Sequence, residues 1–184
     1  MGQNKAFLRI EGVPIIQRTF DLFRTLFREI IVVTNPSDQE RYLQFGVKVF
    51  TDLVPDAGAL GGLYTGLFYS SFFHSFVAAC DMPHLNRSVI EYLMQKKEGY
   101  DVILPETKDG LEPLHAVYSK NCVAPIRSLL GEQKTRIIDL FPFVRVNVVG
   151  PHELFSLDPS MKSFVNLNTP DDVTRYQKDH ISHE

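Results

Sequence analysis

Residues 75–85 read SFVAACDMPHL. The first six of them form an almost entirely apolar run, which is typical of a strand buried on both faces, and Asp81 follows at once. Residues 86–99, NRSVIEYLMQKKEG, carry apolar side chains at helical spacing, with Asn86 as the N-cap and Gly99 as the stop. A buried strand that leads into a helix predicts an α/β fold, with Asp81 at the carboxyl end of a strand.

The same alternation continues on both sides of this stretch. Strands are expected at residues 29–34, 47–51, 101–105, 113–119 and 144–149. Helices are expected from Pro14, at 37–45 with Ser37 as N-cap, from about Gly61, at 122–130 and 137–141, and from Thr169. This order predicts a mostly parallel sheet with helices on both faces, and the Asp-Gly turn at 109–110 adds an antiparallel hairpin. With no internal repeat or linker, residues 1–184 are expected to form one domain.

Charge, hydropathy and cysteine content exclude several classes of function. The net charge is −3 and no run of five like charges occurs, which argues against a general nucleic-acid binder. No stretch reaches the ~18 apolar residues of a membrane span, and no signal pattern opens the chain. Cys80 and Cys122 fit no metal or disulfide spacing, so we expect two buried thiols in a reducing cytoplasm. We therefore expect a cytoplasmic protein with neither nucleic-acid nor membrane partners.

Two acidic residues and one glycine-rich turn could bind a ligand. Asp81 and Asp52 each follow an expected strand, where open α/β sheets bind their ligands. Mg²⁺ takes one or two carboxylates together with phosphate oxygens, although an aspartate after a strand can also cap the next turn. The GALGG turn at residues 58–62 would let the backbone approach a ligand closely, or would serve tight helix packing.

Basic and amide side chains add further candidates. Lys5 follows Gly2 and could place a point charge on a triphosphate, or could be a solvated surface lysine. Asn166 and Asn168 project to one face of an extended segment, or make the turn before the last helix. His115 lies on an apolar strand, where a satisfied core histidine is more common than a metal ligand.

Five segments in this order resemble the molybdenum cofactor guanylyltransferase family. MGQNKAFLRIEGVPII resembles the second half of the family pattern LAGGxSxRMGxxKAxLxxxGxPL, and DAGALGGLYTGL is similar to GPLAGLxxGL. ACDMPHL resembles (C/A)CDMPFL, EPLHAVYS resembles (Q/E)PLxAxYx, and NLNTPDD is similar to NxNTPED. The match is collinear and runs nearly from end to end of the chain.

The resemblance implies a three-layer α/β/α Rossmann-like nucleotidyltransferase fold with a mostly parallel mixed sheet. The N-terminal part would bind the nucleotide and the C-terminal part the pterin acceptor. The implied reaction transfers GMP from GTP to the molybdenum–molybdopterin cofactor with Mg²⁺ and releases pyrophosphate. The alternatives are a molybdenum cofactor cytidylyltransferase, another small nucleotidyltransferase such as one acting on a sugar phosphate, and a catalytically impaired binding module.

The family pattern also implies roles for individual residues. Lys5 and Asp81 would be catalytic, and Asp81 would also hold the metal. The residues implied in nucleotide binding are Lys5, Thr34, Asn35, Asp52, Gly58, Leu60, Gly61 and Asp81. Asn166 and Asn168 would lie toward the acceptor. The implied partners are GTP, molybdopterin and possible recipient molybdoenzymes or their chaperones, and the protein would be a monomer or a weak homo-oligomer.

The family segment LAGGxSxR has no counterpart, because this chain starts at the methionine of the family's RMG. The missing segment would carry a strand that is normally central in a doubly wound sheet. We therefore expect two strands with unpaired edges and an apolar trench between helices. We also expect the native protein to extend upstream of Met1. Only if the protein truly began at Met1 would we expect poor stability or a disturbed dimer, and little transfer activity.

Overall fold

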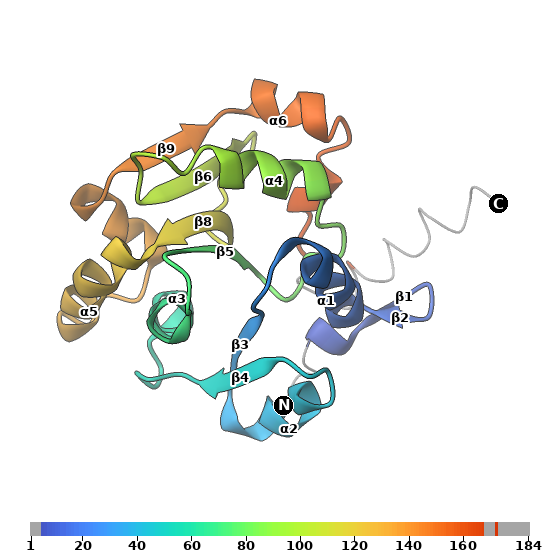
Figure 1. Ribbon diagram of the computed structural model, residues 1–184, viewed down its shortest axis with the longest axis horizontal. Coiled ribbons are helices and arrows are strands. Elements are labelled where there is room, and N and C mark those ends of the chain that lie inside the picture. The colour runs from blue at the N-terminus through green and yellow to red at the C-terminus, as the bar shows by residue number, and fades with distance from the viewer. Residues whose placement is uncertain (1–4, 168–171, 173–184) are drawn as a thin grey trace.

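The computed structural model describes residues 5–167 and residue 172 (Figure 1). Its α-helices are α1 (Ile15–Leu26), α2 (Gln39–Leu43), α3 (Gly58–Tyr69), α4 (Arg87–Gln95), α5 (Val123–Gly131) and α6 (Pro151–Leu157). Its strands are β1 (Arg9–Ile10), β2 (Val13–Pro14), β3 (Ile31–Thr34), β4 (Lys48–Thr51), β5 (His74–Ala78), β6 (Val102–Thr107), β7 (Gly110–Leu111), β8 (His115–Ser119) and β9 (Val146–Val149). Short 3₁₀ helices are η1 (Lys5–Phe7), η2 (Pro36–Asp38), η3 (Lys120–Cys122), η4 (Ile137–Phe143) and η5 (Lys162–Phe164).

The strands form a mixed sheet, as the sequence predicts. The larger part has the order β5-β8-β6-β7, with β9 on β6, and a separate part pairs β3 with β4 in parallel. Strand β8 is antiparallel to both β5 and β6, so these two strands share a direction, and β9 is parallel to β6. Strand β8 is therefore a reversed strand between neighbours that run the same way. The predicted turn at residues 109–110 joins β6 to β7.

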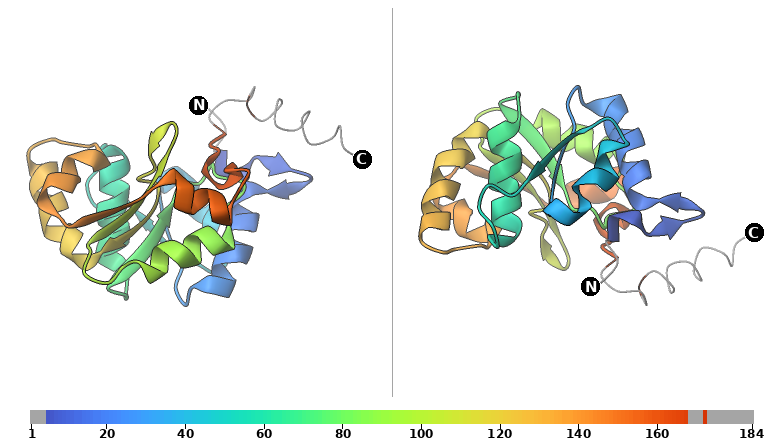
Figure 2. Two further views of the ribbon diagram at one scale, coloured as in Figure 1. Left: turned by 90° about the horizontal axis from the view of Figure 1, so that it is seen from above. Right: turned by 90° about the horizontal axis from the view of Figure 1, so that it is seen from below.

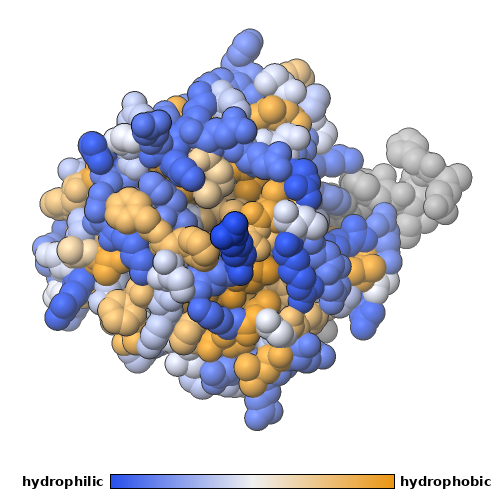
Figure 3. Space-filling model, viewed as in Figure 1, coloured by the Kyte–Doolittle hydropathy of each residue, from blue (hydrophilic) through white to orange (hydrophobic). Residues whose placement is uncertain are grey.

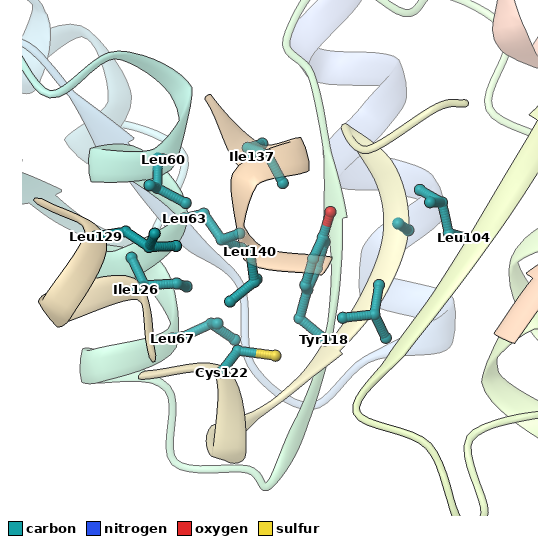
Figure 4. Close-up of a cluster of buried hydrophobic side chains, with 12 residues drawn as sticks. Leu60, Leu63, Leu67, Leu104, Tyr118, Cys122, Ile126, Leu129, Ile137 and Leu140 are labelled. Carbon is teal, nitrogen blue, oxygen red and sulfur yellow. The ribbon is translucent and has the colours of Figure 1, made fainter. Parts of the chain in front are cut away.

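Helices cover both faces of the sheet (Figure 2). Side chains alternate along each strand between the two layers. On β8, Tyr118 packs with α3 and α5 in the cluster of Figure 4, whereas Val117 packs with α4 and α6. On β3, Val32 faces the cluster that includes α1, and Val33 faces Gly66 of α3. This alternation of buried faces confirms the three-layer α/β/α prediction.

Strands β3 and β5 are neighbours without being paired, and an apolar trench of about 640 Å³ lies between them. All four residues of β3 and all five of β5 are only half-buried, whereas all five of β8 are buried. Figure 3 shows apolar side chains in a hollow at the middle of this face. The predicted trench is confirmed, whereas the upstream extension stays a prediction.

Several local expectations were wrong. Helix α3 begins at Gly58 instead of Gly61, because Gly58 has φ +58° and turns the chain into the helix earlier. The short helix expected at residues 137–141 is present, but as a 3₁₀ helix over residues 137–143 with a proline inside it, where an α-helix would lose a hydrogen bond. Ser37 lies inside η2, and Asp38 occupies the N-cap position of α2. Helix α6 and the β1–β2 hairpin were not predicted.

Other local predictions have mixed outcomes. Asn86 caps α4 as predicted, accepting hydrogen bonds from the N–H groups of Ser88 and Val89. Cys122 is buried as expected, but Cys80 is exposed, because it follows the end of β5. The helix predicted from Thr169 lies outside the described residues. None of the described helices is long and apolar enough to span a bilayer.

Candidate functional site

The structure brings Lys5 and Asp81 together at one edge of the sheet. Asp81 follows β5 by three residues, and its Oδ2 atom lies 3.8 Å from Nζ of Lys5. The side chain of Asp81 is 16% exposed and that of Lys5 is 40% exposed, so a ligand could reach both. The distance is at the outer limit of an ion pair. A phosphate and its cation would therefore find opposite charges side by side without first breaking a short bond between them.

Contacts of the neighbouring residues hold the backbone at Lys5 and at Asp81 in place. Ala6, next to Lys5 in η1, is fully buried in a cluster with Phe20 of α1 and Tyr42 of α2. The carbonyl oxygen of Asp81 accepts a hydrogen bond from the N–H of Leu167 at 3.0 Å. Segments far apart in the sequence therefore hold the two groups at this edge.

Asp52 lies across the trench from Asp81, because it follows β4, whereas Asp81 follows β5. Within residues 5–167, its Oδ1 atom is buried and has no hydrogen-bond partner. Burial raises the pKa of this carboxyl group above its usual range. A buried oxygen atom without a partner is costly, so Asp52 is suited to accept a hydrogen bond from a bound ligand.

The GALGG turn beside Asp52 serves packing at least as much as ligand approach. A Cβ atom on Gly61 would lie 2.6 Å from the Cβ of Ala57, so this glycine is required by the turn itself. Leu60 is fully buried in the core, and its N–H donates to the carbonyl of Thr135 at 3.3 Å. This geometry argues against the predicted nucleotide contact by the Leu60 side chain or amide. Gly58 is exposed and remains accessible.

Thr34 and Asn35 lie on the Asp52 side of the trench. Thr34 ends β3 and is paired in register with Thr51, the residue before Asp52. Asn35 is exposed and has extended backbone torsions ahead of η2. Both residues are therefore at the carboxyl edge of the sheet, where the family pattern implies a nucleotide contact.

Of the two asparagines implied at the acceptor side, the structure describes one. Asn166 is half-buried and precedes Leu167, whose N–H donates to the Asp81 carbonyl, so Asn166 is one residue away from a backbone contact with Asp81. Asn168 lies outside the described residues.

Sequence reasoning missed Thr65, which holds the loop after Asp52. Its buried hydroxyl accepts a hydrogen bond from Leu53 N–H at 3.0 Å and donates one to the Gly61 carbonyl at 2.9 Å. The only signal was a threonine four residues after a glycine in a helix, where such bonding to the preceding turn is common. Thr65 therefore positions both Asp52 and the GALGG turn.

His115 is a core residue, as predicted, but it is not satisfied. Within the part of the chain that the structure describes, both ring nitrogens are buried without hydrogen-bond partners. The ring lies 4.7 Å from that of Phe164 and 5.2 Å from that of Phe76. Burial lowers the pKa of His115 to about 3, so the ring stays neutral at physiological pH.

The protein itself could supply few ligands to a metal ion at this edge of the sheet. The described residues contain no group of three histidine, cysteine, aspartate or glutamate side chains that could enclose a metal ion. A cation that takes most of its ligands from a bound nucleotide needs only one or two carboxylates, and Asp81 can supply one.

Comparison with known proteins identifies the family. Residues 1–141 match the sequence model of the MobA-like NTP transferase domain. The chain belongs to this family. MobA-like NTP transferases are nucleotidyltransferases, so the enzyme class expected from the five sequence motifs is confirmed.

Individual members of the MobA-like family cover most of the chain. The "Probable molybdenum cofactor guanylyltransferase" of Pelotomaculum thermopropionicum is 37% identical over 175 residues, covering 95% of this chain and 84% of that protein. The molybdenum cofactor guanylyltransferase of Desulfosudis oleivorans is 34% identical over 176 residues, with 95% and 86% coverage. The crystal structure of molybdopterin-guanine dinucleotide biosynthesis protein A from Archaeoglobus fulgidus superposes with a TM-score of 0.84 at 25% identity, covering 98% of this chain and 92% of that one.

Proposed function

We propose that this chain transfers the GMP moiety of GTP to the molybdopterin form of the molybdenum cofactor, giving the guanine dinucleotide cofactor and pyrophosphate. Relatives named molybdenum cofactor guanylyltransferase support the substrates. The observation that carries the proposal is the Lys5–Asp81 pair, which places a cation and a carboxylate 3.8 Å apart at the carboxyl edge of the sheet.

The reaction needs positioning and charge neutralisation instead of a covalent intermediate. A phosphate oxygen of the pterin attacks the α-phosphorus of GTP and forms a new P–O bond. The bond from the α-phosphorus to the oxygen that bridges to the β-phosphate breaks, and pyrophosphate leaves with that electron pair. Lys5 would stabilise the negative charge that builds on the phosphates, as a point charge within reach of solvent.

We propose Mg²⁺ as the metal of this site. Asp81 fits it, because its carboxylate is partly exposed at the edge where the phosphates would lie and has the Lys5 ammonium group 3.8 Å away. When bound, the ion would neutralise phosphate charge and withdraw electron density from the α-phosphorus. Asp81 would hold and orient it.

The other residues would divide between nucleotide and acceptor. Asp52 would accept a hydrogen bond from the nucleotide with its unpartnered Oδ1 atom. Thr34, Asn35 and Gly58 lie at the same edge and would line the nucleotide side. Asn166, held next to Asp81 by the adjoining Leu167 hydrogen bond, would face the pterin.

Release of pyrophosphate, with GTP, molybdopterin and Mg²⁺ supplied together, tests this function. We expect Asp81→Asn to lower the rate at least 100-fold, because it removes the metal-binding charge but keeps the size of the side chain. Asp109→Asn is the matched control, since Asp109 is exposed in the β6–β7 turn, and its rate should be unchanged. Equal rates for Asp81→Asn and wild type would contradict the proposed site. A preference for CTP would support the cytidylyl alternative.

The remaining expectations on setting and assembly stay predictions. They are a cytoplasmic location, a monomer or weak homo-oligomer, and delivery of the product to molybdoenzymes or their chaperones.

A further inference from the structure

The carboxylate of Asp158 organises the loop that leads from α6 back to Asp81. Asp158 directly follows α6 and is 6% exposed. Its Oδ2 atom accepts hydrogen bonds from the N–H of Ser163 at 2.9 Å and from the hydroxyl of the same residue at 2.7 Å. Its Oδ1 atom accepts another from the hydroxyl of Ser160 at 2.7 Å. Burial alone would raise the pKa of Asp158, but these hydrogen bonds outweigh burial and lower the pKa, so the group is charged at neutral pH.

The loop between Asp158 and Ser163 has a backbone conformation that needs this support. Met161 has φ +51°, in the left-handed region that residues other than glycine rarely adopt. A conformation of this kind persists only where the surrounding contacts enforce it. Hydrogen bonds from three donors to one buried carboxylate are such contacts, because a charged acceptor strengthens each of them. Removal of the charge should therefore let the loop relax.

Leu167 links this loop to the candidate site. Its N–H donates to the carbonyl of Asp81 at 3.0 Å. Its side chain is 2% exposed and packs in a cluster with Ile10 of β1 and Ile15 of α1. Leu167 follows Ser163 by four residues, so a shift of the loop at Ser163 has a short path to the backbone of Asp81.

Few other contacts tie the loop to the segment after Asp81. A cavity of about 430 Å³ is lined by this loop, by residues 82–86 and by α1. The Asn86 side chain reaches the carbonyl of Leu157 at 3.5 Å, which is the outer limit of a hydrogen bond. The 3.0 Å bond from Leu167 is therefore the firmer link between the loop and Asp81.

The segment also has an anchor that does not depend on Asp158. Phe164 of η5 is 8% exposed and packs in the core cluster that includes residues of β8 and α4. Its ring lies 4.7 Å from that of His115. Loss of the Asp158 charge should thus displace residues 159–163 while the chain stays folded.

We propose that Asp158 is a positioning residue for the metal-binding carboxylate: its charge fixes residues 159–163, and Leu167 transmits their position to the backbone of Asp81. The inference rests on the proposed function in one respect, which is the role of Asp81 as a metal ligand. Asp158 acts on the site through Leu167 and has no direct contact with nucleotide or metal.

Amide hydrogen exchange of the ligand-free full chain, followed by NMR, tests the physical link. Asp158→Asn keeps the size of the side chain, removes its charge and turns one acceptor into a donor. We expect exchange at the N–H groups of Ser163 and Leu167 to become about tenfold faster, with no change in residues 115–119 of β8. The exposed Asp109→Asn in the β6–β7 turn is the control and should change neither. Unchanged exchange at Leu167, or equal acceleration in β8, would overturn the positioning role.

Binding of Mn²⁺ in the presence of GTP, measured by electron paramagnetic resonance of the free ion, tests the consequence for the site. Mn²⁺ prefers the same oxygen ligands as Mg²⁺. We expect Asp158→Asn to weaken Mn²⁺ binding about tenfold, whereas Asp109→Asn should bind like wild type. If Asp81→Asn weakens Mn²⁺ binding and Asp158→Asn does not, this inference is overturned and the metal site of the proposed function stands. An unchanged affinity in Asp81→Asn would overturn both.

A double variant tests the route through Leu167. Leu167→Ala removes the buried side chain that holds this link, so it should weaken Mn²⁺ binding by itself. Because both substitutions act on the same link, Asp158→Asn should weaken binding by no more than about twofold when it is added to Leu167→Ala. A full tenfold further loss would mean that Asp158 acts by another route, which contradicts the proposal.

Discussion

Glu29 joins the two sides of the trench, and its removal should weaken the fold measurably. Its carboxylate accepts hydrogen bonds from Lys48 at 2.5 Å and from Ser71 at 2.8 Å. Burial alone would raise the pKa of Glu29, but these hydrogen bonds outweigh burial and lower the pKa from 4.5 to about 2. At about 1.4 kcal/mol per pKa unit, this shift corresponds to about 3 kcal/mol. Because the Lys48 side chain is 54% exposed, solvent screens the pair, and we expect Glu29→Gln to cost about 2 kcal/mol.

Urea unfolding followed by circular dichroism between pH 7 and pH 2 measures this cost and its sign. The folded-state pKa lies below the unfolded one, so the stabilisation is fully present above about pH 4.5 and is lost as the pH falls toward 2. The difference between wild type and Glu29→Gln should therefore be largest at neutral pH and shrink in acid. Asp101 also has a pKa lowered to about 2, but it is present in both proteins, so its contribution to the pH dependence cancels in the difference.

Glu98→Gln is the control, because Glu98 is exposed in the turn after α4. It should leave the free energy of unfolding within about 0.5 kcal/mol of wild type. If Glu29→Gln behaves like Glu98→Gln, or if its effect does not shrink in acid, then Glu29 does not join the two sides of the trench as described.

The packing of Gly61 predicts that Gly61→Ala destabilises the chain by about 1–3 kcal/mol, because the new Cβ would lie 2.6 Å from that of Ala57. Gly131→Ala, whose new Cβ would meet nothing within 4 Å, should leave the stability in the same thermal melts unchanged. His115→Phe should flatten the pH dependence of the free energy of unfolding between about pH 6.5 and 3. As the pH falls through this range, the histidine of the unfolded chain takes up a proton whereas the buried one does not, so the wild-type protein loses stability. An unchanged profile would mean that the ring is not buried in its neutral form. Asp52→Asn should have a melting temperature no lower than that of wild type at pH 7, because it removes a buried carboxylate whose pKa is raised. It should nevertheless bind GTP about tenfold more weakly in calorimetry, and an unaltered affinity would remove Asp52 from the site.

Strand and helix order could be predicted from the sequence where burial sets the pattern. The continuous apolar run before Asp81 and the Asn86 cap are local signals, and both elements are present. The start of α3 was wrong because its cause is a positive φ at Gly58, which residue spacing does not reveal. Helix α6, only seven residues long, carries too few apolar positions to show a period.

The candidate site was predictable only in part, because local sequence patterns do not show contacts between residues that are distant along the chain. Asp52 and Asp81 could be placed because Asp52 directly follows β4 and Asp81 comes three residues after β5. The role of Thr65 could not, because it depends on a hydrogen bond to Leu53 across a loop. Leu60 was implied by its place in a motif, yet the same motif also makes core contacts, and in this turn the leucine points into the core.

The proposed transfer is tested most directly by following the α-phosphorus of the nucleotide. The chain would be incubated with molybdopterin, Mg²⁺ and GTP radiolabelled at the α-phosphate, in parallel with CTP labelled at the same position. The account predicts that label from GTP, and not from CTP, moves into a pterin dinucleotide while unlabelled pyrophosphate is released. Label that stays in GTP, or that moves only from CTP, would contradict it.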